Sequence, residues 1–151
     1  MHLSIRAVLL TLFLTVSCQS NLAKSEARQH RPNWNAEIRH DCAPWDGSAF
    51  RITLTDSNDQ KSSTTTIDVA IWQAPAFNEP VSFTLTESSR IGRVRFVTQF
   101  GTPSVLTGQI GFKRVKESEP VEGNFDFVTK QGDRKQGTFR AIWKPNSALC
   151  G

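Results

Sequence analysis

The segment from His40 to Gly47 (His-Asp-Cys-Ala-Pro-Trp-Asp-Gly) holds a dense group of chemically active side chains. A histidine beside a carboxylate is the pairing that general-base catalysis uses, with His40 as the base and Asp41 as the residue that orients it. Neighbouring residues of a strand point to opposite faces, however, so these two side chains are not expected to hydrogen-bond. The sequence also has no Gly-x-Ser-x-Gly nucleophile turn. We therefore predict no catalytic residues here, and interpret residues 44–47 as a turn.

The residue spacing gives no support for a metal or cofactor site. Zinc needs three or four ligands, whereas His30 and His40 stand ten positions apart with no second pair of ligands nearby. A hydrolase with paired carboxylates stays open as an unfavoured alternative, using residues from the set Asp41, Asp46, Asp68 and Asp126. We predict that the protein binds neither a metal nor a cofactor.

Two tryptophans and two arginines are the candidates for a binding surface. Trp45 and Trp72 fall near expected loops and strand ends, where an exposed indole suits a sugar or a peptide. Arg93 and Arg95 project from the same face of one expected strand, where they suit an anionic polymer. The alternative is that the tryptophans belong to the core and that the arginines are ordinary solvated positions.

The region that must position these residues alternates apolar and polar side chains with a period of two. Phe50, Ile52 and Leu54, for example, alternate with polar residues, which is typical of a half-buried antiparallel strand. We expect strands at residues 34–40, 48–55, 65–73, 81–86, 92–99, 105–116, 121–129 and 136–143. The predicted fold is all-β, a small antiparallel β-sandwich or barrel of about seven or eight strands.

Short connections predict that strands adjacent in sequence pair as a meander. The clearest hairpin joins residues 121–129 to 136–143, with Gly132 at its tip and with Gly123 and Gly137 as expected bulges. The two-residue period predicts that one face of this hairpin is buried and is formed by Phe125, Phe127, Phe139, Ala141 and Trp143.

The first seventeen residues have the layout of a secretory signal. His2 and Arg6 give a short polar and basic start, an apolar run follows from residue 7 to 16, and Ser17 is small. The run is shorter than the roughly 20 apolar residues that a membrane-spanning helix needs. The alternative is a buried N-terminal core helix, which would require a polar face that this run lacks.

Residues Leu14 to Cys18 (Leu-Thr-Val-Ser-Cys) resemble the lipobox of bacterial lipoproteins. The resemblance implies that Cys18 is alkylated by a diacylglyceryl group and becomes the N-terminus after cleavage. Gln19 implies, by similarity to Gram-negative lipoproteins, sorting to the outer membrane. Cleavage near Ser17 without lipidation is the alternative, and it would give a soluble periplasmic or secreted protein.

These interpretations divide the chain into three parts. Residues 1–17 are the expected signal peptide, residues 18–33 the lipidated N-terminus and flexible tether, and residues 34–151 a single β domain. The polar stretch from Ser20 to Asn33 would span about 45 Å at most when extended.

The odd number of cysteines then has an explanation. With Cys18 assigned to lipid by the resemblance, Cys42 and Cys150 remain as one pair, and we expect them to form a disulfide in an oxidising compartment. Two free thiols are the alternative.

Loss of the signal segment removes Arg6 and leaves 17 of the 18 basic side chains against 14 acidic ones. This mild positive charge, without a long basic block, argues against nucleic acid but is compatible with an anionic envelope polymer. We expect a non-catalytic envelope lipoprotein, a binding or assembly module held at the membrane by its lipid, whose partner is an envelope protein or an anionic envelope polymer. The alternative is an inhibitor or immunity protein that acts on a cell-wall enzyme; an unrecognised hydrolase is less favoured.

Overall fold

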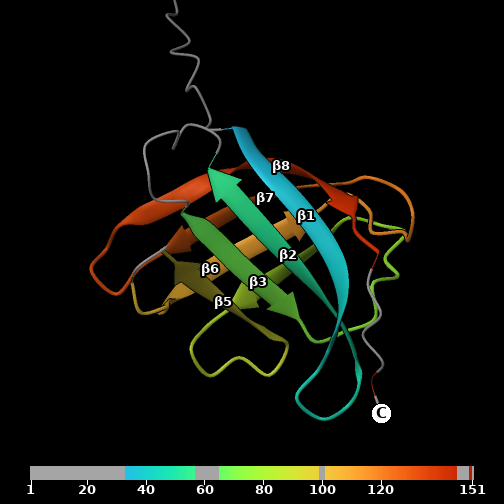
Figure 1. Ribbon diagram of the computed structural model, residues 1–151, viewed down its shortest axis with the longest axis horizontal. Helices are drawn as coiled ribbons and strands as arrows, with labels where there is room; N and C mark the ends of the chain where they lie inside the picture. The colour runs from blue at the N-terminus through green and yellow to red at the C-terminus, as the bar shows by residue number, and fades with distance from the viewer. Residues whose placement is uncertain (1–32, 57–64, 99–100, 146–149, 151) are drawn as a thin grey trace, which may run out of the picture.

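The computed structural model describes residues 33–56, 65–98, 101–145 and 150, which fold into eight β-strands (Figure 1). The strands are β1 (Asn33–Cys42), β2 (Ser48–Asp56), β3 (Thr66–Ile71), β4 (Val81–Leu85), β5 (Gly92–Val97), β6 (Ser104–Phe112), β7 (Val121–Val128) and β8 (Arg134–Trp143). Each strand coincides with a stretch of predicted two-residue alternation, so the all-β prediction is confirmed. The expected signal peptide, Cys18 and the tether up to residue 32 lie outside the described residues.

Seven of the strands close into a barrel, in the order β1-β2-β3-β5-β6-β7-β8. Every neighbouring pair in this ring is antiparallel except β1 and β8, which pair in parallel from Asn33↔Thr138 to Ile38↔Trp143. A closed ring of an odd number of strands cannot alternate direction all the way round, so it must contain a parallel pair. Of the two expected architectures, the structure is therefore the barrel.

Strand β4 departs from the expected meander. It pairs with β6, from Val81↔Phe112 to Leu85↔Gly108, while β3 pairs directly with β5. Strand β5 follows only residues 104–106 of β6, so β4 takes the remaining part of that edge. The meander prediction is wrong at this point, because the edge of β6 left by β5 has backbone groups that need partners and β4 supplies them.

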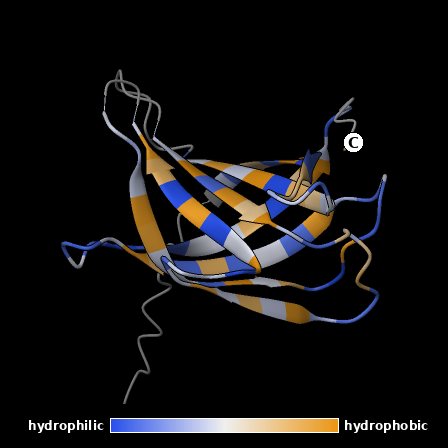
Figure 2. Ribbon diagram, turned by 90° about the horizontal axis from the view of Figure 1, so that it is seen from below, coloured by the Kyte–Doolittle hydropathy of each residue, from blue (hydrophilic) through white to orange (hydrophobic). Residues whose placement is uncertain are grey.

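Apolar side chains fill the barrel. The strands show the expected bands of apolar and polar residues (Figure 2), and no polar or charged side chain is buried among the residues described. Phe77, from the β3–β4 connection, covers this core with its ring 6.3 Å from that of Phe50 and 5.6 Å from that of Phe83. The interior is thus a packed hydrophobic core.

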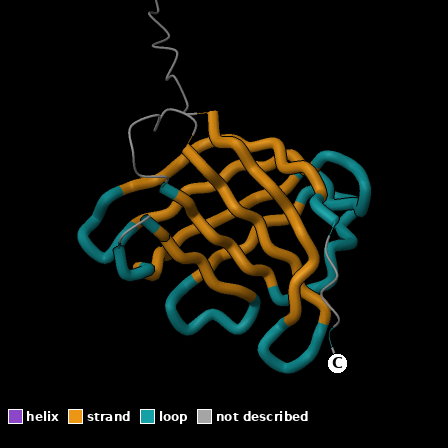
Figure 3. Tube along the Cα trace, viewed as in Figure 1, coloured by secondary structure: helices purple, strands orange, loops and turns teal. Residues whose placement is uncertain are grey.

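The connections between strands lie at the two ends of the barrel (Figure 3). Strand β1 begins at Asn33, at the end we call the entry end, and runs to the far end, where the turn at residues 43–47 leads into β2. In Figure 1 the start of β1 is at the top and this turn is at the bottom. The far end also holds the connections at residues 72–80 and 113–120.

The β7–β8 hairpin has the predicted buried face. Phe125, Phe127, Phe139 and Ala141 are buried and Trp143 is partly buried, while Ile142 is 50% exposed. Gly132 lies at the tip with φ +92°.

The bulges expected at Gly123 and Gly137 are absent, because the register runs without interruption from Val121↔Ala141 to Val128↔Arg134. Gly123 is needed for another reason: a Cβ there would lie 2.5 Å from Cζ of Phe139. The glycine leaves room for this ring to pack across its strand neighbour.

Gly108 lies where β6 pairs with β4 on one side and with β7 on the other. Its φ is +145°, and a Cβ at this position would lie 2.1 Å from the carbonyl oxygen of Asp126. Only glycine combines this backbone conformation with such a close approach of two strands.

A disulfide joins Cys42 at the end of β1 to Cys150, with their Cα atoms 5.5 Å apart. The predicted pairing is confirmed. The bond fixes Cys150 at the far end of the barrel, beside the end of β1.

Candidate binding surface

The turn between β1 and β2 presents Trp45 to solvent. The N–H of Ala43 donates to the carbonyl of Gly47 at 2.7 Å, and the N–H of Asp46 donates to the carbonyl of Ala43 at 3.0 Å. Asp46 has φ +63°, and a Cβ on Gly47 would lie only 3.1 Å from Nε1 of Trp45. The Trp45 side chain is 58% exposed although the backbone beneath it is closely defined.

Trp72 supports this exposed ring. It directly follows β3, and its backbone N–H donates to the carbonyl of Ile91 at 2.9 Å. The rings of Trp45 and Trp72 meet edge to face, with centroids 5.5 Å apart and planes at 78°. The structure thus brings together two of the predicted binding residues from separate connections.

Arg93 and Arg95 lie on the outer face of β5, on either side of the buried Val94. In the sheet register Arg93 stands opposite Ala70 and Arg95 opposite Asp68. Because outward residues of a strand recur every second position, Trp72 continues the outward series of β3 one step beyond Ala70, the partner of Arg93. We call Trp45, Trp72, Arg93 and Arg95 together the Trp–Arg surface.

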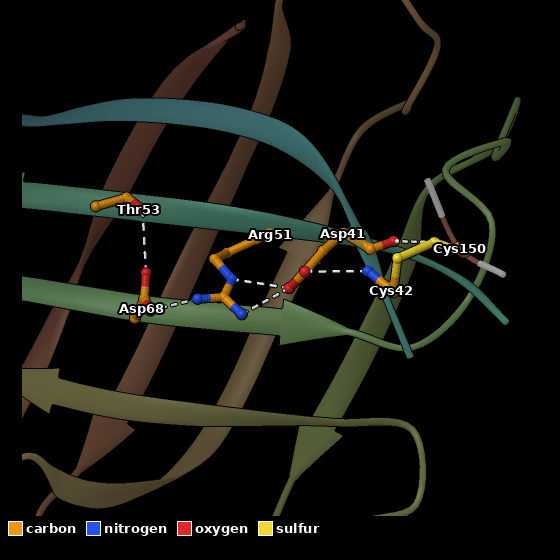
Figure 4. A network of polar contacts seen from close by, with 6 residues as sticks. All are labelled: Asp41, Cys42, Arg51, Thr53, Asp68 and Cys150. Atoms are coloured by element: carbon orange, nitrogen blue, oxygen red, sulfur yellow. Dashed lines mark hydrogen bonds and ion pairs between the residues drawn. A yellow bond between two sulfur atoms is a disulfide. The ribbon is translucent and has the colours of Figure 1, made fainter. Parts of the chain in front are cut away.

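A polar network braces the strands beside this surface (Figure 4). Arg51 donates from Nε to Asp41 at 2.8 Å and from Nη1 to Asp68 at 3.2 Å. Thr53 donates to the other oxygen of Asp68 at 3.1 Å, and the N–H of Cys42 donates to Asp41 at 3.0 Å. The network therefore links β1, β2 and β3 to the disulfide.

Arg51 of the network is paired with carboxylates, whereas the two arginines of the Trp–Arg surface are not paired with any described residue. Arg51 is only 19% exposed and its guanidinium is shared by two carboxylates. Asp68 stands opposite Arg95 in the register, but its oxygens contact Arg51 and Thr53. Within the described residues, Arg93 and Arg95 have no ion-pair partner, which leaves both guanidinium groups available to a ligand.

His40 and Asp41, the residues considered for catalysis, engage different partners. Asp41 contacts Arg51, whereas Nε2 of His40 lies 3.3 Å from a carboxylate oxygen of Glu117 and its ring lies 4.9 Å from that of Trp143. Trp143 in turn donates from Nε1 to the carbonyl of Lys116 at 2.9 Å. His40, Glu117 and Trp143 line an open groove of about 480 Å³ together with Ser118. Glu117 is 62% exposed, so this arrangement resembles a surface contact that holds the 113–120 connection.

Trp34, a tryptophan for which the sequence allowed either a binding role or a place in the core, belongs to the core. It is 4% exposed, its ring packs edge to face with that of Phe125 with 5.3 Å between centroids, and its Nε1 has no hydrogen-bond partner among the described residues. In the described segments no group of three or more histidine, cysteine or acidic residues is arranged to hold a metal ion.

The protein is thus a small closed β-barrel with a packed interior, and it carries the tryptophans and arginines of the Trp–Arg surface on its outside. Comparison with protein-family models, with curated protein sequences and with solved structures finds no match. The part of the chain that is described contains no helix long and apolar enough to cross a membrane.

Proposed function

We propose that this protein is an exported, non-catalytic binding module, anchored by lipid on Cys18, which uses the Trp–Arg surface to hold a partner in the cell envelope. The observation that supports this most directly is the contact between the exposed Trp45 and the partly exposed Trp72, near two arginines that form no ion pair with a described residue. Exposed aromatic and arginine side chains are the residue types enriched at binding hot spots.

The course of β1 supports an arrangement in which anchor and binding surface are separated. The chain enters the barrel at Asn33, and β1 leads from there to the turn that bears Trp45. Ten residues of strand at about 3.3 Å each separate the two positions by roughly 30 Å. A lipid on Cys18 would therefore join the chain to the membrane through the entry end and leave the Trp–Arg surface free.

The packed interior supports binding on the outside of the barrel. Barrels that hold a small ligand keep a cavity among their inner side chains. Here the inner positions are occupied by large residues such as Phe50, Phe112 and Phe127, which contact one another or their neighbours in the core.

The anchor is tested by growing cells that express the full chain with labelled palmitate and fractionating the envelope. The wild-type protein should take up label and sediment with the outer membrane, and Cys18→Ser should abolish the label. A soluble wild-type protein whose N-terminus is a residue other than Cys18 would refute the anchor.

The binding surface is tested by cross-linking in intact envelopes followed by purification of the lipidated protein. Trp45→Ala should remove most of the specific cross-linked products. Ile142→Ala is the matched control, because Ile142 is also an exposed large apolar residue, 50% exposed, but lies on β8. Equal loss in both variants would argue against this surface.

An inhibitor of a cell-wall enzyme is the second candidate, and one observation favours it. Trp45 projects from a tight turn next to the disulfide at Cys42, which is the form of a rigid loop that can enter an enzyme cleft. Among the described residues of the connections at 75–80 and 101–103, no aromatic residue is comparably exposed. Inhibition of purified cell-wall hydrolases by the wild-type protein, lost in Trp45→Ala, would support this candidate.

A further inference from the structure

The basic side chains of the described residues fall into two groups. Those of the first group form ion pairs: Arg51 with Asp41 and Asp68, Lys113 with Glu122, Lys116 and Arg114 with Glu119, Lys130 with Glu87, Arg134 with Asp126, and Lys144 with Glu37. The second group forms no ion pair within the described residues and consists of Arg39, Arg90, Arg93, Arg95, Lys135 and Arg140. Of these, Arg93 and Arg95 are the two that share one face of one strand, the outer face of β5, which pairs with β3 ahead of Trp72.

The chemistry of this surface combines two kinds of contact. A guanidinium group binds a carboxylate through two parallel hydrogen bonds, a geometry that a lysine cannot provide. The Trp45 ring contacts Trp72 through an edge-to-face arrangement and remains 58% exposed, so an indole surface is open to a further planar or ring-shaped apolar group. The C–H face of a pyranose ring is such a group, and it packs on aromatic rings.

We propose that the Trp–Arg surface binds a polysaccharide that bears carboxylate groups, with a sugar ring against Trp45 and carboxylates at Arg93 and Arg95. This inference rests on the proposed function and names the ligand of the same surface. The site is an open sheet face rather than an enclosed pocket, which suits a long chain that passes across the strands. It also lies toward the far end of the barrel, away from the end at which the proposed anchor and its tether join β1. The cell-wall glycan, whose stem peptides supply carboxylates, fits this position better than a lipid headgroup.

The test is co-sedimentation of the lipidated full chain, with its disulfide intact and in mild detergent, with purified peptidoglycan sacculi. We expect binding that weakens with increasing salt, because exposed charges are screened. Conversion of the sacculus carboxylates to amides should lower binding about tenfold or more. Trp45→Ala and the double variant Arg93→Gln/Arg95→Gln should each lower the affinity about tenfold or more, in keeping with loss of hot-spot contacts.

Two variants serve as matched controls for non-specific effects of removing an exposed charge or an exposed apolar side chain. Arg140→Gln removes an exposed arginine from the outer face of β8, and Ile142→Ala removes an exposed apolar side chain from the same strand. Both should bind sacculi like the wild type. Circular dichroism and thermal melts should show that all variants are folded.

Competing ligands decide between sources of negative charge. Soluble peptidoglycan fragments should displace the protein, whereas polyaspartate, which is anionic but has no sugar, and neutral chitin oligosaccharides should displace it poorly. Equal displacement by polyaspartate, preference for lipopolysaccharide micelles over sacculi, or binding that ignores Trp45 and both arginines would overturn the proposal. If the protein fails to bind sacculi while Trp45-dependent protein cross-links persist, the glycan assignment is wrong and the binding surface stands. If neither sacculus binding nor Trp45-dependent cross-links are observed, the Trp–Arg surface itself is refuted.

Discussion

Trp45 and Trp72 meet edge to face with their ring centroids 5.5 Å apart, although one lies in the β1–β2 turn and the other follows β3. The contact depends on β2, which pairs with β1 on one side and with β3 on the other and so brings both connections to the far end. A ring that is already held by a neighbour loses less freedom when a ligand binds. The pair is therefore better suited to recognition than an isolated exposed tryptophan.

The disulfide predicts a large loss of stability when it is removed. Cys42→Ala opens a loop between residues 108 positions apart, for which the chain-entropy relation gives roughly 4–5 kcal/mol. The variant should melt at a markedly lower temperature than the wild type under oxidising conditions. Added reductant should lower the melting temperature of the wild type and leave that of Cys42→Ala nearly unchanged. Cys18→Ser serves as the control, and equal melting of Cys42→Ala and the wild type would contradict the prediction.

The filled interior predicts a strong contrast between neighbouring positions of β7. Phe127 is fully buried and its ring lies 5.6 Å from that of Phe125, so Phe127→Ala should destabilise the protein by about 3–5 kcal/mol. Val128 is the next residue and is 36% exposed, so Val128→Ala should change stability by about 0.5 kcal/mol or less. Urea unfolding of both variants measures the difference. Similar losses at the two positions would mean that the alternation in β7 is incorrectly assigned.

Secondary structure was predictable from the sequence because each strand has one buried face. The alternation that places Phe125 and Phe127 inside is visible in the sequence, and so is the turn at Gly132. The pairing of β4 with β6 was not visible, since alternation identifies a strand but not the edge that will accept its hydrogen bonds. Closure by a parallel β1–β8 pair was equally hidden, because it depends on how many strands enter the ring.

The candidate site was predictable as a set of residues but not as an arrangement. Trp45, Trp72, Arg93 and Arg95 were selected from the sequence by type and place near strand ends, and the register sets them on one outer face. The role of Arg51 was missed. An arginine alternating with apolar residues is ordinary in sequence, and only the pairing of β2 with both neighbours puts it between two carboxylates.

The position of Arg51 between two carboxylates predicts that Arg51 stabilises the fold more than the outward-facing Arg93 does. Arg51→Met leaves Asp41 and Asp68, which are 26% and 20% exposed, without their shared cation. Loss of hydrogen bonds to partly buried charged groups should destabilise the protein by about 1–3 kcal/mol at neutral pH. Arg93→Met, on the same outer face but without an ion pair in the described residues, should have little effect. Chemical denaturation of both variants tests this, and equal stability of the two would contradict the bracing role of the network.

The ion pair between Asp126 and Arg134 predicts a defined dependence on pH. The hydrogen bond from Arg134, followed by its positive charge, holds the pKa of Asp126 below the ordinary value of 3.8. Because the folded-state pKa is lowered, the folded protein binds this proton less readily than the unfolded chain does. The stabilisation is therefore present at pH values above the unfolded pKa and is lost as the pH falls through the folded pKa. The free energy of unfolding of Asp126→Asn should accordingly lie below that of the wild type at neutral pH and approach it in acid.

Carboxyl ¹³C NMR titration measures the pKa of Asp126 directly. Arg134→Gln should raise this pKa toward its ordinary value. Glu122, on the same strand, is the internal control, since its pKa is lowered mainly by a hydrogen bond from Lys113 and should not change in Arg134→Gln. An unchanged titration of Asp126 in this variant would show that Arg134 does not set its pKa.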